Sequence, residues 1–313
     1  MSQTNSSTSS FKLFLVKVLL PFLLSLIIAG YLFGLFFEKK VILNSNICGA
    51  YKVNRIIKET HPEEIPIFGS SRAEGGYIPD MLGTNYFNYG LDGTGSSVML
   101  FFLKEECKKK KKSPLIILNF DLSGFDHPLG DISNYIYNAG YTPVKDLLGK
   151  NYKSSFSIPF IKYYGQYETY LKYYLNNRLN LTKYTNKGAS IEKNKMTSKR
   201  FNELVEQRKN SIAGFAQDTA LKNEYLRIIA ENPQRLFVFV VAPYHPSYFD
   251  GFKNLPEADF FLQKLREEKN VRVFDFSREV YADSLFINTT HVNYSGALRF
   301  NKDLKDSIAK LSY

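Results

Sequence analysis

Residues 65–72 read Ile-Pro-Ile-Phe-Gly-Ser-Ser-Arg, a pattern that could present a serine hydroxyl for nucleophilic chemistry. A short apolar run of strand type stops at Gly69, and Ser70 and Ser71 follow directly. In open α/β sheets, ligands bind beyond the carboxyl ends of the strands, and a glycine allows the sharp turn that exposes a hydroxyl there. The same residues also fit a plain turn that ends in an N-capping serine. The chemistry therefore depends on whether the chain supplies a base and an oxyanion site.

A candidate base lies near the C-terminus, in the polar segment 286–297, which reads Phe-Ile-Asn-Thr-Thr-His-Val-Asn-Tyr-Ser-Gly-Ala. His291 stands in this loop just before the last predicted helix, so we do not expect it in the core. A neutral imidazole is the commonest general base for a serine hydroxyl. Among the other histidines, His245 follows a predicted strand; it could line the same cleft or be an ordinary loop residue.

Backbone amides for an oxyanion are offered by the segment 88–96, which reads Asn-Tyr-Gly-Leu-Asp-Gly-Thr-Gly-Ser after a second apolar run. A glycine-rich loop at the end of a strand leaves N–H groups exposed, and these can bind a developing oxyanion. A tight turn into an N-capped helix is the alternative interpretation. A third apolar run ends in Asn119, Phe120 and Asp121, which places polar side chains at the same edge.

The order of these segments resembles the SGNH, or GDSL-like, hydrolase superfamily, especially its membrane-anchored acyltransferase and esterase-like members that act on cell-envelope polymers. The run 69–72 looks like the first block of that family, with Ser71 in the nucleophile position. Gly93 falls on the oxyanion glycine of a second block, Asn-x-Gly-x-x-Gly at 88–93. His291 opens a segment similar to the terminal His-Leu-Asn-x-x-Gly block.

The resemblance implies roles for these residues. Ser71 would attack an ester carbonyl while His291 takes the hydroxyl proton, and the backbone N–H groups of Ser71 and Gly93, with Asn119, would hold the oxyanion. No organic cofactor is implied, and the few cysteines and histidines have no metal-ligand spacing. Arg72, beside the nucleophile, would bind an anionic acceptor or form a structural salt bridge. The candidate substrate-binding residues are Arg72, Asp121 and His245.

Two positions depart from the family pattern. Asn288 stands where family members carry an aspartate three residues before the histidine. Its amide oxygen can accept a hydrogen bond from His291 but brings no charge, and a reversed amide would favour the wrong tautomer; in a serine protease this exchange lowers turnover roughly ten-thousandfold. Asp283 or a backbone carbonyl could orient the ring instead. Asp121 occupies the family's asparagine position, where a carboxylate cannot donate, and Asn119 would donate if the register shifts by two.

The elements that must position these loops alternate along the chain. Strand-length apolar runs are followed by helical stretches, which indicates a mostly parallel sheet covered on both faces. We expect a three-layer α/β/α sandwich with a flavodoxin-like, SGNH-type sheet over residues 65–313. The predicted strands are 65–68, 84–88, 115–120, 236–242 and 271–274, and the predicted helices are 96–109, 219–231, 257–269 and 294–311.

A long insertion rich in Tyr, Lys and Asn is predicted at about residues 123–235. Tyrosines recur at intervals of three and four over 163–174, a spacing typical of a helix face that packs on a core. A platform that stacks on sugar rings is the alternative. The insertion has no counterpart in the family blocks.

Residues 18–37 form an uncharged apolar run of twenty residues, which matches the thickness of a bilayer core. The run is too long for a signal-peptide core and lacks a cleavage site. We therefore predict a disordered tail over 1–10, one transmembrane anchor over 11–38 and a helical connector over 39–64. Basic residues on both sides leave the orientation open. The family resemblance implies a single-pass protein of the cytoplasmic membrane with an extracytoplasmic C-terminal domain.

The formal net charge of +11 suggests an acidic partner such as anionic lipid or an acidic polysaccharide. No nucleic-acid motif accompanies it, so we expect no nucleic-acid binding. The predicted function is a membrane-anchored serine esterase or O-acyltransferase, with acetyl as the expected group, that acts on a cell-envelope polysaccharide. The alternative is a catalytically degenerate SGNH-like module that binds glycan or assembles with envelope export machinery. The sequence leaves the acyl group, the acceptor and the oligomeric state open.

Overall fold

Five parallel strands form the central sheet of the computed structural model, in the order β2-β1-β3-β6-β7. The structure describes residues 11–43, 48–177, 185–192, 197–209 and 213–311; the predicted tail at 1–10 lies outside them. The strand order is that of a flavodoxin-like doubly wound sheet. Its strands are β1 (Ile65–Phe68), β2 (Tyr86–Asn88), β3 (Leu115–Asn119), β6 (Leu236–Val241) and β7 (Val271–Asp275).

Alternate residues of the central strands point into two separate cores. In β3, Leu115 and Ile117 belong to one core, whereas Ile116 and Leu118 belong to the other. β6 repeats this alternation, and all residues of both strands are buried. Successive side chains of a strand point to opposite faces, so a continuously apolar strand needs cover on both sides.

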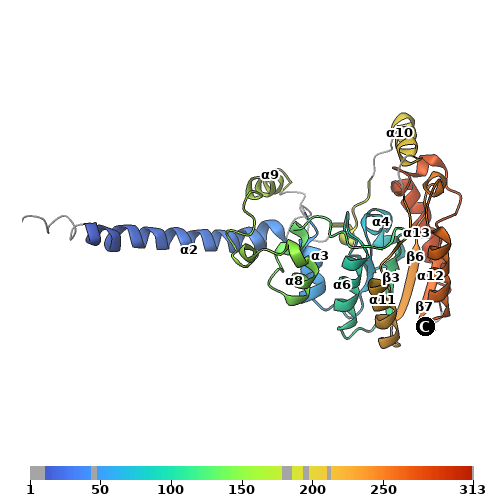
Figure 1. Ribbon diagram of the computed structural model, residues 1–313, viewed down its shortest axis with the longest axis horizontal. Coiled ribbons are helices and arrows are strands. Elements are labelled where there is room, and N and C mark those ends of the chain that lie inside the picture. Colours follow the sequence, from blue (N-terminus) through green and yellow to red (C-terminus); the bar gives the residue numbers. More distant parts are fainter. Residues whose placement is uncertain (1–10, 44–47, 178–184, 193–196, 210–212, 312–313) are drawn as a thin grey trace, which may run out of the picture.

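Helices cover both faces of the sheet, which confirms the predicted three-layer α/β/α fold (Figure 1). The core on one face includes residues of α4 (Ser71–Gly76), α5 (Pro79–Leu82) and α13 (Tyr294–Ile308). The core on the other face includes residues of α3 (Ala50–Lys58), α6 (Ser96–Cys107), α11 (Thr219–Glu231) and α12 (Leu255–Glu267).

Polar side chains cap the helices that carry the candidate site. Ser70 accepts a hydrogen bond from the backbone N–H of Arg72 at the start of α4, and Asn293 accepts two from the first turn of α13. Such caps satisfy helix N–H groups that would otherwise lack partners. They fix the point at which each loop ends, so that Ser71 opens α4 and His291 lies just before α13.

The predicted insertion contains a second, two-stranded parallel sheet and several short helices. Its final stretch belongs to the main sandwich, because α11 is one of the helices that cover the sheet. Two short helices outside the insertion are η6 (Pro246–Phe249) and η7 (Asp283–Leu285). The insertion's own elements are β4 (Gly124–Phe125), α7 (Ser133–Ile136), α8 (Thr142–Leu148), η3 (Gly149–Asn151), η4 (Ser154–Ser157), α9 (Tyr167–Asn177), η5 (Thr185–Gly188), α10 (Ser198–Lys209) and β5 (Ala216–Gln217).

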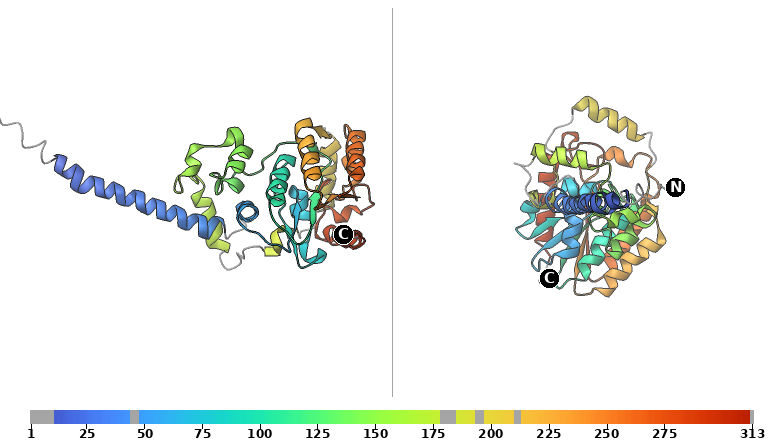
Figure 2. Two further views of the ribbon diagram at one scale, coloured as in Figure 1. Left: turned by 90° about the horizontal axis from the view of Figure 1, so that it is seen from below. Right: turned by 90° about the vertical axis from the view of Figure 1, so that its left-hand side faces the viewer.

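One continuous helix over Phe11–Ile42 is long and apolar enough to cross a membrane, with a mean hydropathy of 2.5 in its most apolar stretch. It consists of α2 (Leu20–Phe37) flanked by π-helical turns η1 (Leu15–Leu19) and η2 (Glu38–Ile42). The helix therefore extends past residue 38, where we expected the anchor to end. Figures 1 and 2 show it projecting away from the sandwich.

Candidate active site

Ser71 stands at the carboxyl edge of the sheet, as the first residue of α4 and three residues beyond β1. Gly69 makes this tight connection possible. A Cβ atom at position 69 would lie 2.6 Å from the Cβ of Ala73 and 2.8 Å from that of Asn119, closer than side chains can approach. The chain therefore turns from strand to helix within two residues and exposes the first hydroxyl of the helix.

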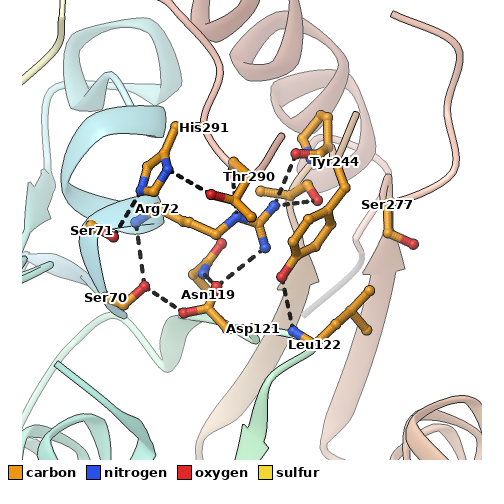
Figure 3. A network of polar contacts seen from close by, with 12 residues as sticks. Ser70, Ser71, Arg72, Asn119, Asp121, Leu122, Tyr244, Ser277, Thr290 and His291 are labelled. Carbon is orange, nitrogen blue, oxygen red and sulfur yellow. Dashed lines mark hydrogen bonds and ion pairs between the residues drawn. The ribbon is translucent and has the colours of Figure 1, made fainter. Parts of the chain in front are cut away.

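The structure brings Ser71 and His291 together across 220 positions of sequence (Figure 3). The Nε2 atom of His291 lies 2.8 Å from Ser71 Oγ, which is hydrogen-bond distance. An imidazole nitrogen at this distance can take the hydroxyl proton when the oxygen attacks an electrophile. The contact has the geometry that a serine nucleophile and its base require.

Asn288 holds the imidazole in the tautomer that this chemistry requires. Its Oδ1 atom accepts hydrogen bonds from the backbone N–H groups of Thr290 and His291, each at 2.9 Å. Both groups can only donate, so the amide must present its oxygen, not its NH₂, to this turn. The same oxygen lies 3.1 Å from His291 Nδ1, which must therefore carry the proton. Nε2 is left free to accept the proton of Ser71, and the reversed amide that would favour the wrong tautomer is excluded.

Thr290 is a residue of the site that the sequence did not indicate. Its hydroxyl donates to Asn288 Oδ1 at 3.0 Å, and its oxygen lies 2.8 Å from His291 Nδ1. The oxygen can therefore accept the Nδ1 proton together with the asparagine oxygen. A polar β-branched residue next to the histidine was the available signal, but loops contain many such residues.

The base is weak. Desolvation in the site, together with the positive charge of Arg72, lowers the pKa of His291 from 6.5 to about 4; Asp121 and Asp92 act in the opposite direction. Asn288 adds no negative charge beside the ring. The imidazole is therefore neutral near pH 7, as a base must be, but its protonated form is poorly stabilised.

This low pKa predicts the pH dependence of any activity that uses His291 as a base. The neutral ring is the active form, so kcat/KM should stay level as the pH falls through 6.5 and should decline only near pH 4. The measurement is kcat/KM for an activated acetyl ester between pH 4 and 8, with corrections for spontaneous hydrolysis. An acid limb near 6.5 would show that the site does not lower the pKa of the acting base.

Arg72 connects α4, which begins at Ser71, to the loop that contains His291. Its Nε donates to the carbonyl of Thr290 at 2.8 Å, and its Nη2 donates to the carbonyls of Ala242 and Pro243 at 2.7 and 2.9 Å. The guanidinium also stacks on Tyr244, 3.4 Å from the ring centroid. These contacts commit the buried cation to protein groups, so they support a structural role and not the anion-binding role that we considered.

Asp121 is the acceptor at the centre of a second set of contacts. It accepts hydrogen bonds from the Ser70 hydroxyl, from Arg72 Nη1 at 3.2 Å and from Asn119 Nδ2 at 2.8 Å (Figure 3). Asn119 is nearly fully buried, and its Oδ1 accepts from the hydroxyl of Tyr77 at 2.9 Å. The side chain of Asn119 is therefore held between Tyr77 and Asp121, and these contacts give Asn119, at the end of β3, and Asp121, just after it, a supporting position.

The backbone N–H groups of Ser71 and Gly93 are the oxyanion donors that the sequence suggested. Among the described residues, the N–H groups of Ser71 and Gly93 have no hydrogen-bond acceptor. Gly93 has φ of +67°, in the left-handed region that favours glycine. Unpaired backbone N–H groups are the kind of donor that can bind an oxyanion.

Lys52, a buried lysine that the sequence did not indicate, forms a hydrogen bond with the glycine-rich loop at residues 88–96. Nζ of Lys52 donates to the carbonyl of Gly90 at 2.5 Å and to Glu74 of α4 at 2.8 Å. Asn88 adds a donated hydrogen bond to the carbonyl of Ala73 at 2.7 Å. Lys52 lies in the predicted connector, on α3, so no pattern within the folded domain pointed to it.

His245 supports the histidine loop. Its backbone N–H donates to the carbonyl of Thr289 at 3.0 Å, its Nε2 lies 3.1 Å from Asp283, and its ring packs against Phe201 and Phe286. His245 is 8% exposed, so these contacts support a structural position and not a substrate-binding one. Asp283, which we considered as an alternative partner of His291, pairs with this second histidine instead.

A cavity of about 610 Å³ opens beside the glycine loop. Its lining includes Asp92 and Gly93 of the loop, Glu74 of α4, Asn134 of α7 and Tyr173 of α9. Asn134 is 5% exposed, and its Nδ2 has no hydrogen-bond partner in the described part of the chain. Within the described residues there is also no group of three or more His, Cys, Asp or Glu side chains that could hold a metal ion.

No protein-family model and no curated protein matches this sequence. Among solved structures, the chain is similar in part to a Streptococcus pneumonia protein described as a platelet activating factor, with 12% identity over 87% of this chain and 95% of that chain. The TM-score of that likeness is 0.39.

Proposed function

We propose that the protein is a membrane-anchored serine esterase or O-acyltransferase of SGNH type. The observation that carries this proposal is the 2.8 Å contact between Ser71 Oγ and His291 Nε2, with Asn288 Oδ1 holding the opposite nitrogen. The contact joins a hydroxyl at a helix start to an imidazole whose acceptor nitrogen faces it. That arrangement favours nucleophilic attack on a carbonyl carbon.

The reaction proceeds in two acyl transfers. Ser71 Oγ attacks the ester carbonyl while its proton passes to His291 Nε2, and the N–H groups of Ser71 and Gly93 bind the oxyanion of the tetrahedral intermediate. As the intermediate collapses, the leaving alcohol takes the proton from His291 and an acyl group remains on Ser71. A second hydroxyl, from water or from a sugar, then attacks the acyl group while its proton passes to His291. The bond between the acyl group and Ser71 Oγ breaks, and Ser71 takes the proton back from His291.

We propose that the acceptor or donor is a hydroxyl-rich glycan that binds in the cavity beside Gly93. The lining combines amide, carboxylate and phenol side chains, which suit the hydroxyl groups of a sugar. Asn134 lines this space, and its Oδ1 is held by the backbone N–H of Gly49 at 2.6 Å. A membrane anchor would hold this site at the envelope, on the extracytoplasmic side of the cytoplasmic membrane.

A second candidate function is favoured by Asn288 and by the low pKa of His291. A base without a neighbouring carboxylate turns over slowly, so the same fold would also serve as a binding module that attaches to a glycan or to export machinery without catalysis. The two functions differ in whether Ser71 reacts.

Labelling with a fluorophosphonate probe distinguishes them. The full-length protein in detergent is expected to form a covalent adduct on the Ser71 peptide, located by mass spectrometry, because the probe needs an activated serine and two oxyanion donors. The heat-denatured protein provides the control for non-specific labelling. An adduct on another serine, or none above that control, would rule out the proposed nucleophile and leave the binding module.

A further inference from the structure

Two glycines on the anchor helix make room for a segment of the insertion. Gly30 and Gly34 are four residues apart and so lie on one face of α2. A Cβ atom at position 34 would lie 2.7 Å from the carbonyl carbon of Pro159 and 2.8 Å from the nitrogen of Phe160, while one at position 30 would contact the Phe160 ring at 3.6 Å. Small residues at this spacing let another backbone approach closely, as in helix contacts within membranes.

Aromatic and charged contacts extend this packing toward the end of the helix. The ring of Phe37 lies 5.4 Å from that of Tyr163 and 4.6 Å from that of Tyr167. Glu38 and Lys162 form an ion pair whose side chains are both less than one tenth exposed. The tyrosine-rich stretch thus packs against the anchor helix with part of its surface. Figure 1 shows α9 beside the end of this helix.

The contact lies within the apolar run of the anchor. Gly30 precedes Phe37, the last residue of that run, by seven positions, so at 1.5 Å per residue it lies about 10 Å inside its end. If the run spans the bilayer core, the residues packed on Gly30 and Gly34 lie in its outer third, about 5 to 10 Å below the boundary with the headgroups.

The outward side of the packed segment is apolar. Ile158 is 39% exposed, Ile161 37% and Tyr164 89%, next to an anchor helix that is itself exposed. Lys39 and Lys40 are exposed at the same end of the helix. Aromatic and basic side chains around exposed aliphatic ones are typical of the interface between a membrane and water.

We propose that residues 158–164 form a second membrane contact, inserted just below the headgroups, in the outer acyl-chain region beside the anchor helix. This inference rests on the membrane anchoring in the proposed function but not on any reaction of Ser71. The occupant is the lipid bilayer, because the exposed apolar surface is continuous with that of the spanning helix. The anchor helix and residues 158–164 together would fix the orientation of the domain on the membrane. Helix α9 packs on the anchor helix through Tyr167 and lines the cavity with Tyr173, so the cavity would lie close to the membrane surface.

The absence of tryptophan from the sequence allows a direct test. Full-length single-tryptophan variants Ile161→Trp and Tyr164→Trp are reconstituted in liposomes whose phosphatidylcholine carries bromine near the headgroup end of the acyl chain. We expect fluorescence at both positions to be quenched at least twofold. Phe22→Trp, within the anchor, provides the positive control. Phe260→Trp, 59% exposed on α12 and remote from the anchor, provides the negative one.

Quenching of the tryptophans at positions 161 and 164 that is no greater than at position 260 would overturn the proposal. The surface would then face water or a second copy of the chain, and not lipid. Loss of quenching at 22 as well would overturn the anchor too. Adding Gly34→Leu to the Tyr164→Trp variant should reduce the quenching, because the new side chain would meet the Pro159 backbone. Ala29→Leu, exposed on the same helix, should leave it unchanged. None of these readouts depends on probe labelling, so the two proposals fail separately.

Discussion

Replacing Ser71 by alanine should lower kcat for an activated acetyl ester by a factor of about 10³ or more. The substitution removes the atom that would form the acyl intermediate, while His291, Asn288 and the backbone N–H groups of residue 71 and Gly93 stay in place. What remains is the small acceleration that binding and the oxyanion donors provide. The measurement is steady-state turnover of the full-length protein, with a burst experiment to detect the acyl intermediate.

Ser70→Ala is the matched control, since it removes a hydroxyl one residue away. Ser70 contacts Asp121 and the N–H of Arg72 but not His291. Loss of such a cap costs about 1 kcal/mol of stability, and turnover should stay within about tenfold of the wild type. If the two variants lost activity equally, the nucleophile would be misassigned; if neither did, the site would not catalyse the reaction.

Replacing Asn288 by aspartate should raise kcat/KM by about tenfold to a hundredfold. A carboxylate oxygen at the position of Asn288 Oδ1 would keep the hydrogen bonds from the N–H groups of Thr290 and His291. It would also place a negative charge about 3 Å from His291 Nδ1, which stabilises the imidazolium that forms as Ser71 attacks. The acid limb of the pH profile should move upward from about pH 4 in the same variant.

Asn85→Asp adds the same charge at an exposed position just before β2, at the opposite edge of the sheet, and should change neither the rate nor the acid limb. An Asn288→Asp variant with a wild-type rate and an unchanged limb would show that this position does not set the strength of the base. A faster rate with an unchanged limb would contradict an electrostatic origin of the gain.

Much of the fold follows from local pattern. β1 and α11 begin and end at the predicted residues, and the other strands of the main sheet differ from prediction by one or two residues at an end. Buried parallel strands and capped helices have distinct local signatures, because one needs continuous apolarity and the other needs a polar side chain at its start. The part of the insertion before α11 lacked such signatures, and its short helices were not individually predicted.

The sequence by itself determined that a serine follows the first strand, that a histidine precedes the last helix and that one helix can span a membrane. Tertiary structure alone decided which atoms meet. Lys52 behind the glycine loop, Thr290 beside the imidazole and the orientation of the Asn288 amide depend on groups that are distant in the chain or on backbone donors that any residue supplies. Chain patterns report burial and turns, whereas hydrogen-bond partners are selected only when the whole fold brings donors and acceptors within about 3 Å.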